Sequence, residues 1–134
     1  MVCFGRDFDA SRFSGFHIAC RRGFHNEIIE AAGGVNVIAE EKVDYIQIAA
    51  EAVLRLDPEV IIELVSELKP GGKKEDEIAR QWEVLAPVAA VRDHRVRVIV
   101  GDHAIRPVPR TVKFVEDLAR ILHPAAFVEA PRRD

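Results

Sequence analysis

The chain alternates between short apolar runs and segments whose apolar residues recur with helical spacing, and few folds accommodate this alternation. The apolar runs that suit buried strands cover residues 2–4, 16–20, 59–64 and 96–100. The segments that suit helices cover residues 25–32, 49–56, 75–83 and 109–122. Parallel strands need crossover connections, and these are usually helical. The order therefore predicts an α/β fold: a three-layer, Rossmann-like lobe with a mostly parallel sheet of four to five strands and helices on both faces.

Glycine and proline residues predict where the helices begin and end. Gly33-Gly34 supplies a left-handed stop for the first helix, and Asp57-Pro58 closes the second. Pro109 suits the first turn of the last helix, and Pro124 stops it. The apolar stripe expected along this last helix consists of Val112, Val115, Leu118, Ala119 and Leu122.

Length and charge restrict the class of protein further. The 134 residues suit one domain, and we expect a single lobe over residues 1–124 followed by a loose tail over 125–134. The net charge is −3 and the basic residues are dispersed, so the electrostatic footprint of a nucleic-acid-binding protein is missing. No apolar run approaches the roughly 20 residues that a bilayer-spanning helix needs. Residues 1–5 lack the basic and apolar regions of an export signal, so we expect no signal peptide in this chain.

The spacings that enzymes use are absent from the sequence. Gly71-Gly72-Lys73 lacks the upstream glycine and the following Ser or Thr of a phosphate-binding loop. A cysteine phosphatase needs an arginine six positions after its nucleophile, where Asn26 follows Cys20 and Asp9 follows Cys3. There is no Gly-x-Ser-x-Gly elbow, and the histidines lack metal-ligand spacing. We therefore expect no catalytic site, no metal and no cofactor, and the chain is not predicted to be an enzyme.

Two alternatives stay open at this point. Asp102 ends the last expected strand, as an acidic-pocket residue of a receiver-like fold would. Cys3 and Cys20 suit either buried free thiols or a disulfide.

Three stretches carry a family resemblance. Residues 23–37 contain a short helix and the turn Gly33-Gly34-Val35-Asn36. Residues 45–62 contain Tyr-Ile-Gln-Ile-Ala-Ala-Glu and then Asp-Pro-Glu-Val-Ile-Ile, and the third stretch joins Trp82 with residues 91–102, 106–110 and 118–124. In order and spacing these stretches resemble the C-terminal lobe of the cobalamin and iron-siderophore class of periplasmic substrate-binding proteins of ABC transporters. The resemblance covers nearly the whole chain from Gly23 onward.

The resemblance implies a two-lobed parent that holds its ligand in a cleft between α/β lobes joined by a long helix. The N-terminal lobe and that helix would precede Met1, so this chain would be one lobe, either of a half-length protein or of a truncated one. The implied partners are a small metal chelate (cobalamin, a siderophore or haem), the membrane subunits of the transporter and the other lobe. The implied location is periplasmic or extracytoplasmic, with the cytoplasm left open because no signal peptide is expected.

The resemblance also assigns residues. Glu51 matches the family glutamate that pairs with arginines of the membrane subunits, and its alternative is a helix-dipole glutamate without a partner. Ala49 stands where the family usually has a capping serine, and Ile46 where it has proline. The missing cap should cost about 1 kcal/mol.

Open α/β sheets bind ligands at the carboxyl ends of their strands, and this rule selects the residues expected to face the cleft. They are Arg21, Arg22, Phe24, His25, Trp82, His103 and Arg106. The arginines suit carboxylates or propionates, and the aromatic rings suit the face of a corrin, haem or siderophore. Trp82 has the alternative role of a core anchor, and Phe24 that of a hydrophobic staple. Bulky Arg21 and Arg22 replace small residues of the family, which favours an anionic guest.

A rival function comes from a different class of protein. The surface that meets the second lobe in such a parent could serve as a homodimer interface, which would make the chain a self-associating interaction module with no role in ligand transport.

Overall fold

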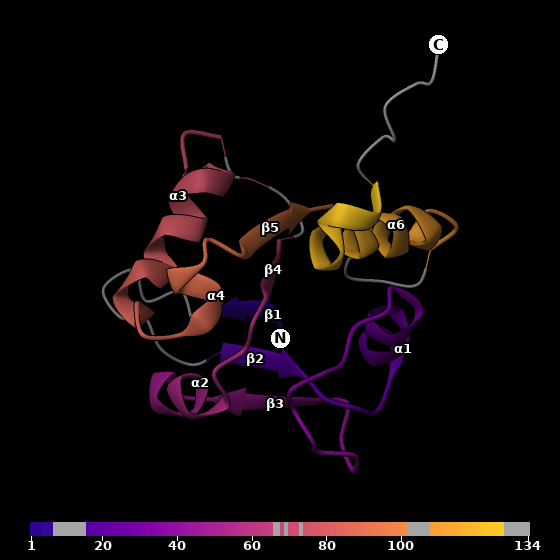
Figure 1. Ribbon diagram of the computed structural model, residues 1–134, viewed down its shortest axis with the longest axis horizontal. Coiled ribbons are helices and arrows are strands. Elements are labelled where there is room, and N and C mark those ends of the chain that lie inside the picture. The colour runs from indigo at the N-terminus through magenta and orange to yellow at the C-terminus, as the bar shows by residue number, and fades with distance from the viewer. Residues whose placement is uncertain (7–15, 66–67, 69, 73, 102–107, 128–134) are drawn as a thin grey trace.

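The computed structural model describes residues 1–6, 16–65, 68, 70–72, 74–101 and 108–127 (Figure 1). The strands are β1 Val2–Arg6, β2 Phe16–Ala19, β3 Tyr45–Ile48, β4 Ile61–Val65 and β5 Val96–Val100. The α-helices are α1 Phe24–Ala31, α2 Ala50–Leu56, α3 Glu75–Arg80, α4 Ala89–Arg92 and α6 Thr111–Leu122. Two 3-10 helices are η1 Gln81–Leu85 and η2 Pro124–Phe127. Among these described helices, none combines the length and apolar character needed to cross a bilayer.

The strands form one sheet in the order β3-β2-β1-β4-β5. β4 pairs in parallel with β1 and β5, whereas β2 pairs antiparallel with both β1 and β3. Four of the five described strands therefore point the same way, and β2 alone among them is reversed. This confirms the predicted α/β class and the mostly parallel sheet.

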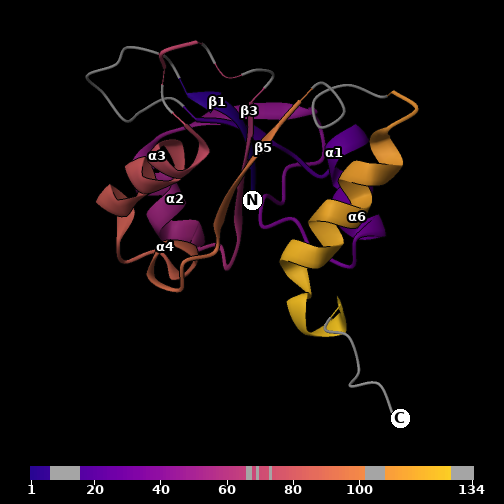
Figure 2. The ribbon, with the colours of Figure 1, turned by 90° about the horizontal axis from the view of Figure 1, so that it is seen from above.

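Helices cover both faces of the sheet. Figure 2 shows α2, α3 and α4 on one face and α1 with α6 on the other. The first core lies on the α2 side; its largest side chains are Phe16, Ile18, Ile61 and Trp82. The second core lies on the α1 and α6 side; it includes Ile28, Ile62, Leu64, Phe114 and Leu118. The expected three-layer arrangement is thus confirmed.

β4 is buried on both faces because successive strand residues point to opposite sides. Ile61 enters the first core, whereas Ile62 and Leu64 enter the second. Glu63 also points toward the first core and is only 3% exposed. Its carboxylate accepts a hydrogen bond of 2.8 Å from the indole Nε1 of Trp82. A buried polar group needs such a partner, because losing its water shell without one is costly.

Several elements differ from the expectations. β3 was not predicted, because it is a short edge strand whose residues are only exposed or half-buried and therefore lack a continuous apolar run. The helix expected over 75–83 ends at Arg80 and continues as η1. The four-residue α4 was also not predicted. η2 occupies the first residues after the lobe, and the remaining residues of the expected tail lie outside the described part.

The buried side of α6 differs from the predicted stripe. Phe114 is fully buried and was not included, whereas Val112 was included and is 66% exposed. At 3.6 residues per turn, Val112 lies about 200° around the helix from Phe114. Phe114 and Leu118, four apart, face the sheet together. Val112 consequently points away from the second core.

This correction can be tested with two substitutions on the same helix. Phe114→Ala should lower the free energy of unfolding by about 3–5 kcal/mol, because it leaves a cavity in the second core. Val112→Ala should change it by no more than about 0.5 kcal/mol. Urea unfolding followed by far-UV circular dichroism measures both. Equal losses for the two variants would contradict the observed orientation of α6.

Candidate functional site

Glu51 lies in the first turn of α2, directly after β3, and its side chain is exposed. The N-cap residue Ala49 makes no side-chain capping bond, as expected from the missing serine. In the part of the chain that the structure describes, no hydrogen bond or ion pair engages the Glu51 carboxylate. The helix dipole favours a negative charge at this position. Glu51 therefore offers a fixed, solvated anion at the surface.

Phe24 and His25 begin α1, and half-buried Phe24 packs against the second core. His25 is 2% exposed; its ring centroid lies 4.8 Å from that of Phe24 and 6.4 Å from that of Phe114. The phenol oxygen of Tyr45 lies 3.4 Å from His25 Nδ1. Burial, and then the nearby Asp44 carboxylate, raises the pKa of Tyr45, so the phenol stays protonated at neutral pH. The contact with Phe114 brings the start of α1 beside the first turn of α6.

Arg21 and Arg22 follow β2, and both have partners. Because β2 is antiparallel to β1, Ile18 pairs opposite Cys3, so the two arginines follow the end of the sheet where β1 begins. This corrects the assumption that they follow the same end as β5. Arg21 donates from Nε and Nη2 to the Asn36 carbonyl oxygen at 3.4 and 3.3 Å.

Arg22 is exposed, and its partners are an aspartate and a backbone carbonyl oxygen. Its Nε lies 3.3 Å from Asp44 Oδ1, and its Nη1 donates to the Lys42 carbonyl oxygen at 2.9 Å. The two side chains of this ion pair are 62% and 51% exposed. Pairs this exposed contribute little, so Arg22 can exchange Asp44 for another anion at small cost.

Trp82 is a correction to the expected ligand contacts. The side chain is fully buried in the first core, with its ring centroid 5.0 Å from that of Phe16. This core lies across the sheet from α1 and His25. Trp82 thus occupies the position of a core anchor, and its ring does not face a cleft together with Phe24. His103 and Arg106 lie outside the described residues.

In the turn after α1, the left-handed stop predicted at Gly33-Gly34 is confirmed at Gly33, and Asn36 has a structural role that the sequence did not predict. Gly33 has a φ of +83°, which favours glycine, and a Cβ atom on Gly34 would meet Leu122 Cδ1 at 2.7 Å, so that the Leu122 side chain would have to move. Buried Asn36 donates from Nδ2 to the Ala19 carbonyl oxygen at 2.9 Å and accepts from the Ile38 amide at 3.1 Å. The turn is thereby fixed to β2.

Asp57, the aspartate of the Asp-Pro motif, also has a structural role. It ends α2 with a left-handed φ of 45°, and its Oδ1 accepts a hydrogen bond of 2.8 Å from the Ala89 amide. That bond caps the first turn of α4. An aspartate immediately before a proline and a buried strand was the available signal for this role.

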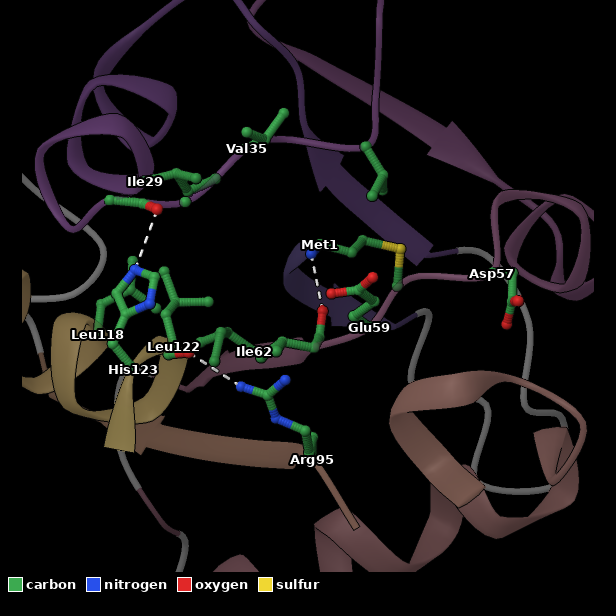
Figure 3. A pocket seen from close by; sticks show the side chains of 14 residues that line it. Met1, Ile29, Val35, Asp57, Glu59, Ile62, Arg95, Leu118, Leu122 and His123 are labelled. Atoms are coloured by element: carbon green, nitrogen blue, oxygen red, sulfur yellow. Dashed lines mark hydrogen bonds between the residues drawn. The ribbon is translucent and has the colours of Figure 1, made fainter. Parts of the chain in front are cut away.

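A pocket of about 410 Å³ opens where β1, β4 and β5 begin (Figure 3). We call it the amino-end pocket. Its lining residues are Met1, Ile29, Gly33, Gly34, Val35, Val37, Asp57, Glu59, Val60, Ile62, Arg95, Leu118, Leu122 and His123. No prediction from the sequence included it, because its walls come from five separate parts of the chain.

The Cys20 thiol and the potential metal ligands are the remaining chemistry-bearing groups of the described residues. Cys20 is a buried free thiol whose pKa is raised by burial, then by the Glu40 and Asp44 carboxylates, which keeps it protonated and unreactive. Where the structure describes the chain, no group of three or more His, Cys, Asp or Glu side chains is arranged to hold a metal ion. The side chain of Cys3 lies outside the described part.

Comparisons with known proteins agree on one family. The family model for the periplasmic binding protein matches residues 1–102. The vitamin B12-binding protein of Vibrio cholerae is 32% identical over 97 residues, which is 72% of this chain and 33% of that protein. An uncharacterized ABC transporter substrate-binding lipoprotein of Bacillus subtilis is 28% identical over 106 residues, which is 79% of this chain and 31% of that protein.

Solved structures give the same result. The crystal structure of the periplasmic vitamin B12-binding protein of Vibrio cholerae matches with a TM-score of 0.69 and 26% identity, over 95% of this chain and 45% of that one. The periplasmic haem-binding protein of Roseiflexus, in its apo form, matches with a TM-score of 0.66 and 26% identity, over 93% of this chain and 45% of that one. The chain thus spans about a third of the length of the curated relatives it matches.

The role of Asn36 can be tested against its neighbour. Asn36→Ala should lower the free energy of unfolding by about 1–3 kcal/mol, because it leaves the buried Ile38 amide and Ala19 carbonyl without their partner. Val35→Ala, at a residue that is 80% exposed, should change it by at most about 0.5 kcal/mol. Chemical denaturation measures both, and an Asn36 variant as stable as the Val35 variant would remove the role assigned to the side chain.

Proposed function

The chain belongs to the periplasmic binding protein family, and on this basis we propose that it is the ligand-binding and transporter-docking lobe of an ABC-transporter substrate-binding protein. The family is a transport-related binding fold rather than a class of enzymes. The proposed ligand is cobalamin, an iron siderophore or a haem-like chelate. The lobe performs no chemistry and holds its guest against a second lobe that this chain does not contain.

The docking role rests on one observation, the exposed carboxylate of Glu51, which is unpaired within the described part of the chain. The other motif residues are engaged within the lobe: Asn36 binds backbone groups of β2 and of its own turn, and Asp57 caps α4. Glu51 is exposed and has no partner among the described residues. An unpaired carboxylate on a rigid helix suits a cationic partner, because opposite charges steer and orient the encounter. We assign that partner to an arginine of the transporter's membrane subunits.

The corner between α1 and α6 is the proposed ligand-facing wall. The ring contact of His25 with Phe114 brings the start of α1 to the first turn of α6. Residues 102–107, which include His103 and Arg106, join β5 to α6 in sequence. Arg22 lies just before α1, in an ion pair that a ligand carboxylate could replace. We propose that Arg22, Phe24, His25, His103 and Arg106 contribute to the cleft, without Trp82.

We also propose an extracytoplasmic location. The support is the family, together with the Bacillus subtilis relative, which is named as a lipoprotein. The Vibrio cholerae structure is of a periplasmic protein.

The lobe alone should bind its guest weakly. A ligand pocket normally buries most of its guest, and one wall of a cleft supplies only part of those contacts. Isothermal titration of this chain with cyanocobalamin, ferric hydroxamate and haem should give dissociation constants above about 1 µM for the preferred ligand. Nanomolar binding would contradict the one-lobe argument, and no saturable binding of any of them up to about 1 mM would remove the ligand role.

The docking role predicts a selective loss in one variant. Glu51→Gln should weaken binding to the cognate membrane subunits in nanodiscs about tenfold, because the charge pair is lost while the side-chain shape is kept. Glu116→Gln, at an exposed position of α6, is the matched control and should bind like the unaltered chain. Surface plasmon resonance measures both. If the two variants bind equally well, Glu51 is not the docking residue.

A further inference from the structure

Charged groups of both signs line the amino-end pocket: the Met1 ammonium group, which donates to the Val60 carbonyl oxygen at 2.9 Å, and the side chains of Arg95, Asp57 and Glu59. Arg95 precedes β5 and Glu59 precedes β4, and both line the pocket. No ion pair joins them. We propose that this pocket is a second binding site for a small zwitterion with an aliphatic body, the chemical class of the free aliphatic amino acids. This inference does not depend on the proposed transport function.

Arg95 is held in place while part of its guanidinium stays available. Its Nη2 donates to the Ile121 and Leu122 carbonyl oxygens at 3.2 and 3.1 Å, which fixes the side chain to the end of α6. In the described residues, Nε and Nη1 have no partner. A half-buried guanidinium held this way matches a carboxylate in geometry and loses little freedom on binding it.

Glu59 and Asp57 supply the opposite charge. Glu59 is exposed, and its carboxylate has no partner within the described chain. Asp57 uses Oδ1 to cap α4, which leaves its second oxygen as a further acceptor. The carboxyl end of α2 reaches the same side of the pocket through Asp57 and adds negative partial charge. An ammonium group fits this side.

The rest of the lining is apolar except for His123, whose Nε2 lies 3.0 Å from the Gly33 carbonyl oxygen. Ile62 and Leu118 form a buried floor, and Ile29, Val37 and Leu122 form the sides. Figure 3 shows Arg95 and Glu59 on one side of the hollow and Ile29 across from them. An amino acid has the same layout, since its two charges sit at one end and its aliphatic side chain at the other. The volume of about 410 Å³ falls in the range of small-molecule sites.

Other kinds of guest fit this lining less well. A simple anion would meet the Glu59 and Asp57 carboxylates, and a simple cation would meet Arg95. An uncharged apolar guest would take water from both charges and give them no partner, which is costly. Only a guest with both charges satisfies both sides.

The pocket is also separate from the proposed docking residue. Asp57 closes α2 at the pocket, whereas Glu51 lies in the first turn of the same helix. Binding at the pocket and docking through Glu51 are therefore independently measurable.

The test is a titration of the whole chain, followed by 1H–15N correlation NMR, with L-leucine, L-leucinamide and N-acetyl-L-leucine. The amide lacks the carboxylate, and the acetylated form lacks the ammonium group. L-Leucine should give saturable shifts that cluster on Val37, Glu59 and Leu122, and each analogue should bind at least about fivefold more weakly. No saturable shift by about 20 mM, shifts elsewhere, or equal binding of all three compounds would overturn the proposal.

A charge variant gives an independent outcome. Glu59→Gln, at an exposed position, should bind L-leucine at least about fivefold more weakly and should no longer prefer it over N-acetyl-L-leucine. Glu83→Gln, at an exposed position of η1 outside the pocket, should bind like the unaltered chain. Unchanged selectivity in the Glu59 variant would overturn the assignment of the ammonium group to this carboxylate.

Discussion

β4 contributes side chains to both cores, and the rest of the lobe depends on this double burial. β1 and β5 pair with it on either side, so β4 lies between two parallel neighbours. Ile61 packs in the core beneath α2, and Ile62 packs in the core beneath α1 and α6. Neither layer of helices can therefore shift without disturbing the same strand. Glu63 is the exception within this apolar strand, and its bond with Trp82 allows a carboxylate to stay inside the first core.

The polar residues of the family motifs are of two kinds: some fix loops to the sheet and helices, and one lies exposed at the surface. Asn36 and Asp57 use their side chains to fix loops to β2 and to α4, which is why an amide and a carboxylate are found where the chain has little room. Within the described part of the chain, the Glu51 carboxylate makes no such contact, and it remains at the surface. The contrast separates residues that build the lobe from one that is free to serve a partner.

The sequence was sufficient for the elements that bury a clear pattern. Residues 59–64 and 96–100 are recognisable as strands because they are mostly apolar and rich in β-branched residues. α1 and α2 are recognisable as helices because their ends carry Gly33-Gly34 and Asp57-Pro58. β3 was not predicted from the sequence, because an edge strand buries only part of each side chain. The direction of β2 is set by pairing with β1 and β3, which no local pattern reports, so the sequence could not show that Arg21 and Arg22 follow the end of the sheet where β1 begins. Trp82 is equally ambiguous, since an indole suits a core as well as a ligand.

The enclosure of Trp82 has a spectroscopic consequence. It is the chain's single tryptophan, and its indole is sealed from water beside Phe16. Dissolved quenchers such as acrylamide can reach it only when the first core opens, so its emission reports that opening rather than events at the surface. A colourless guest in the amino-end pocket would leave the emission unchanged, whereas loss of the helical layer over the first core would shift it to longer wavelength.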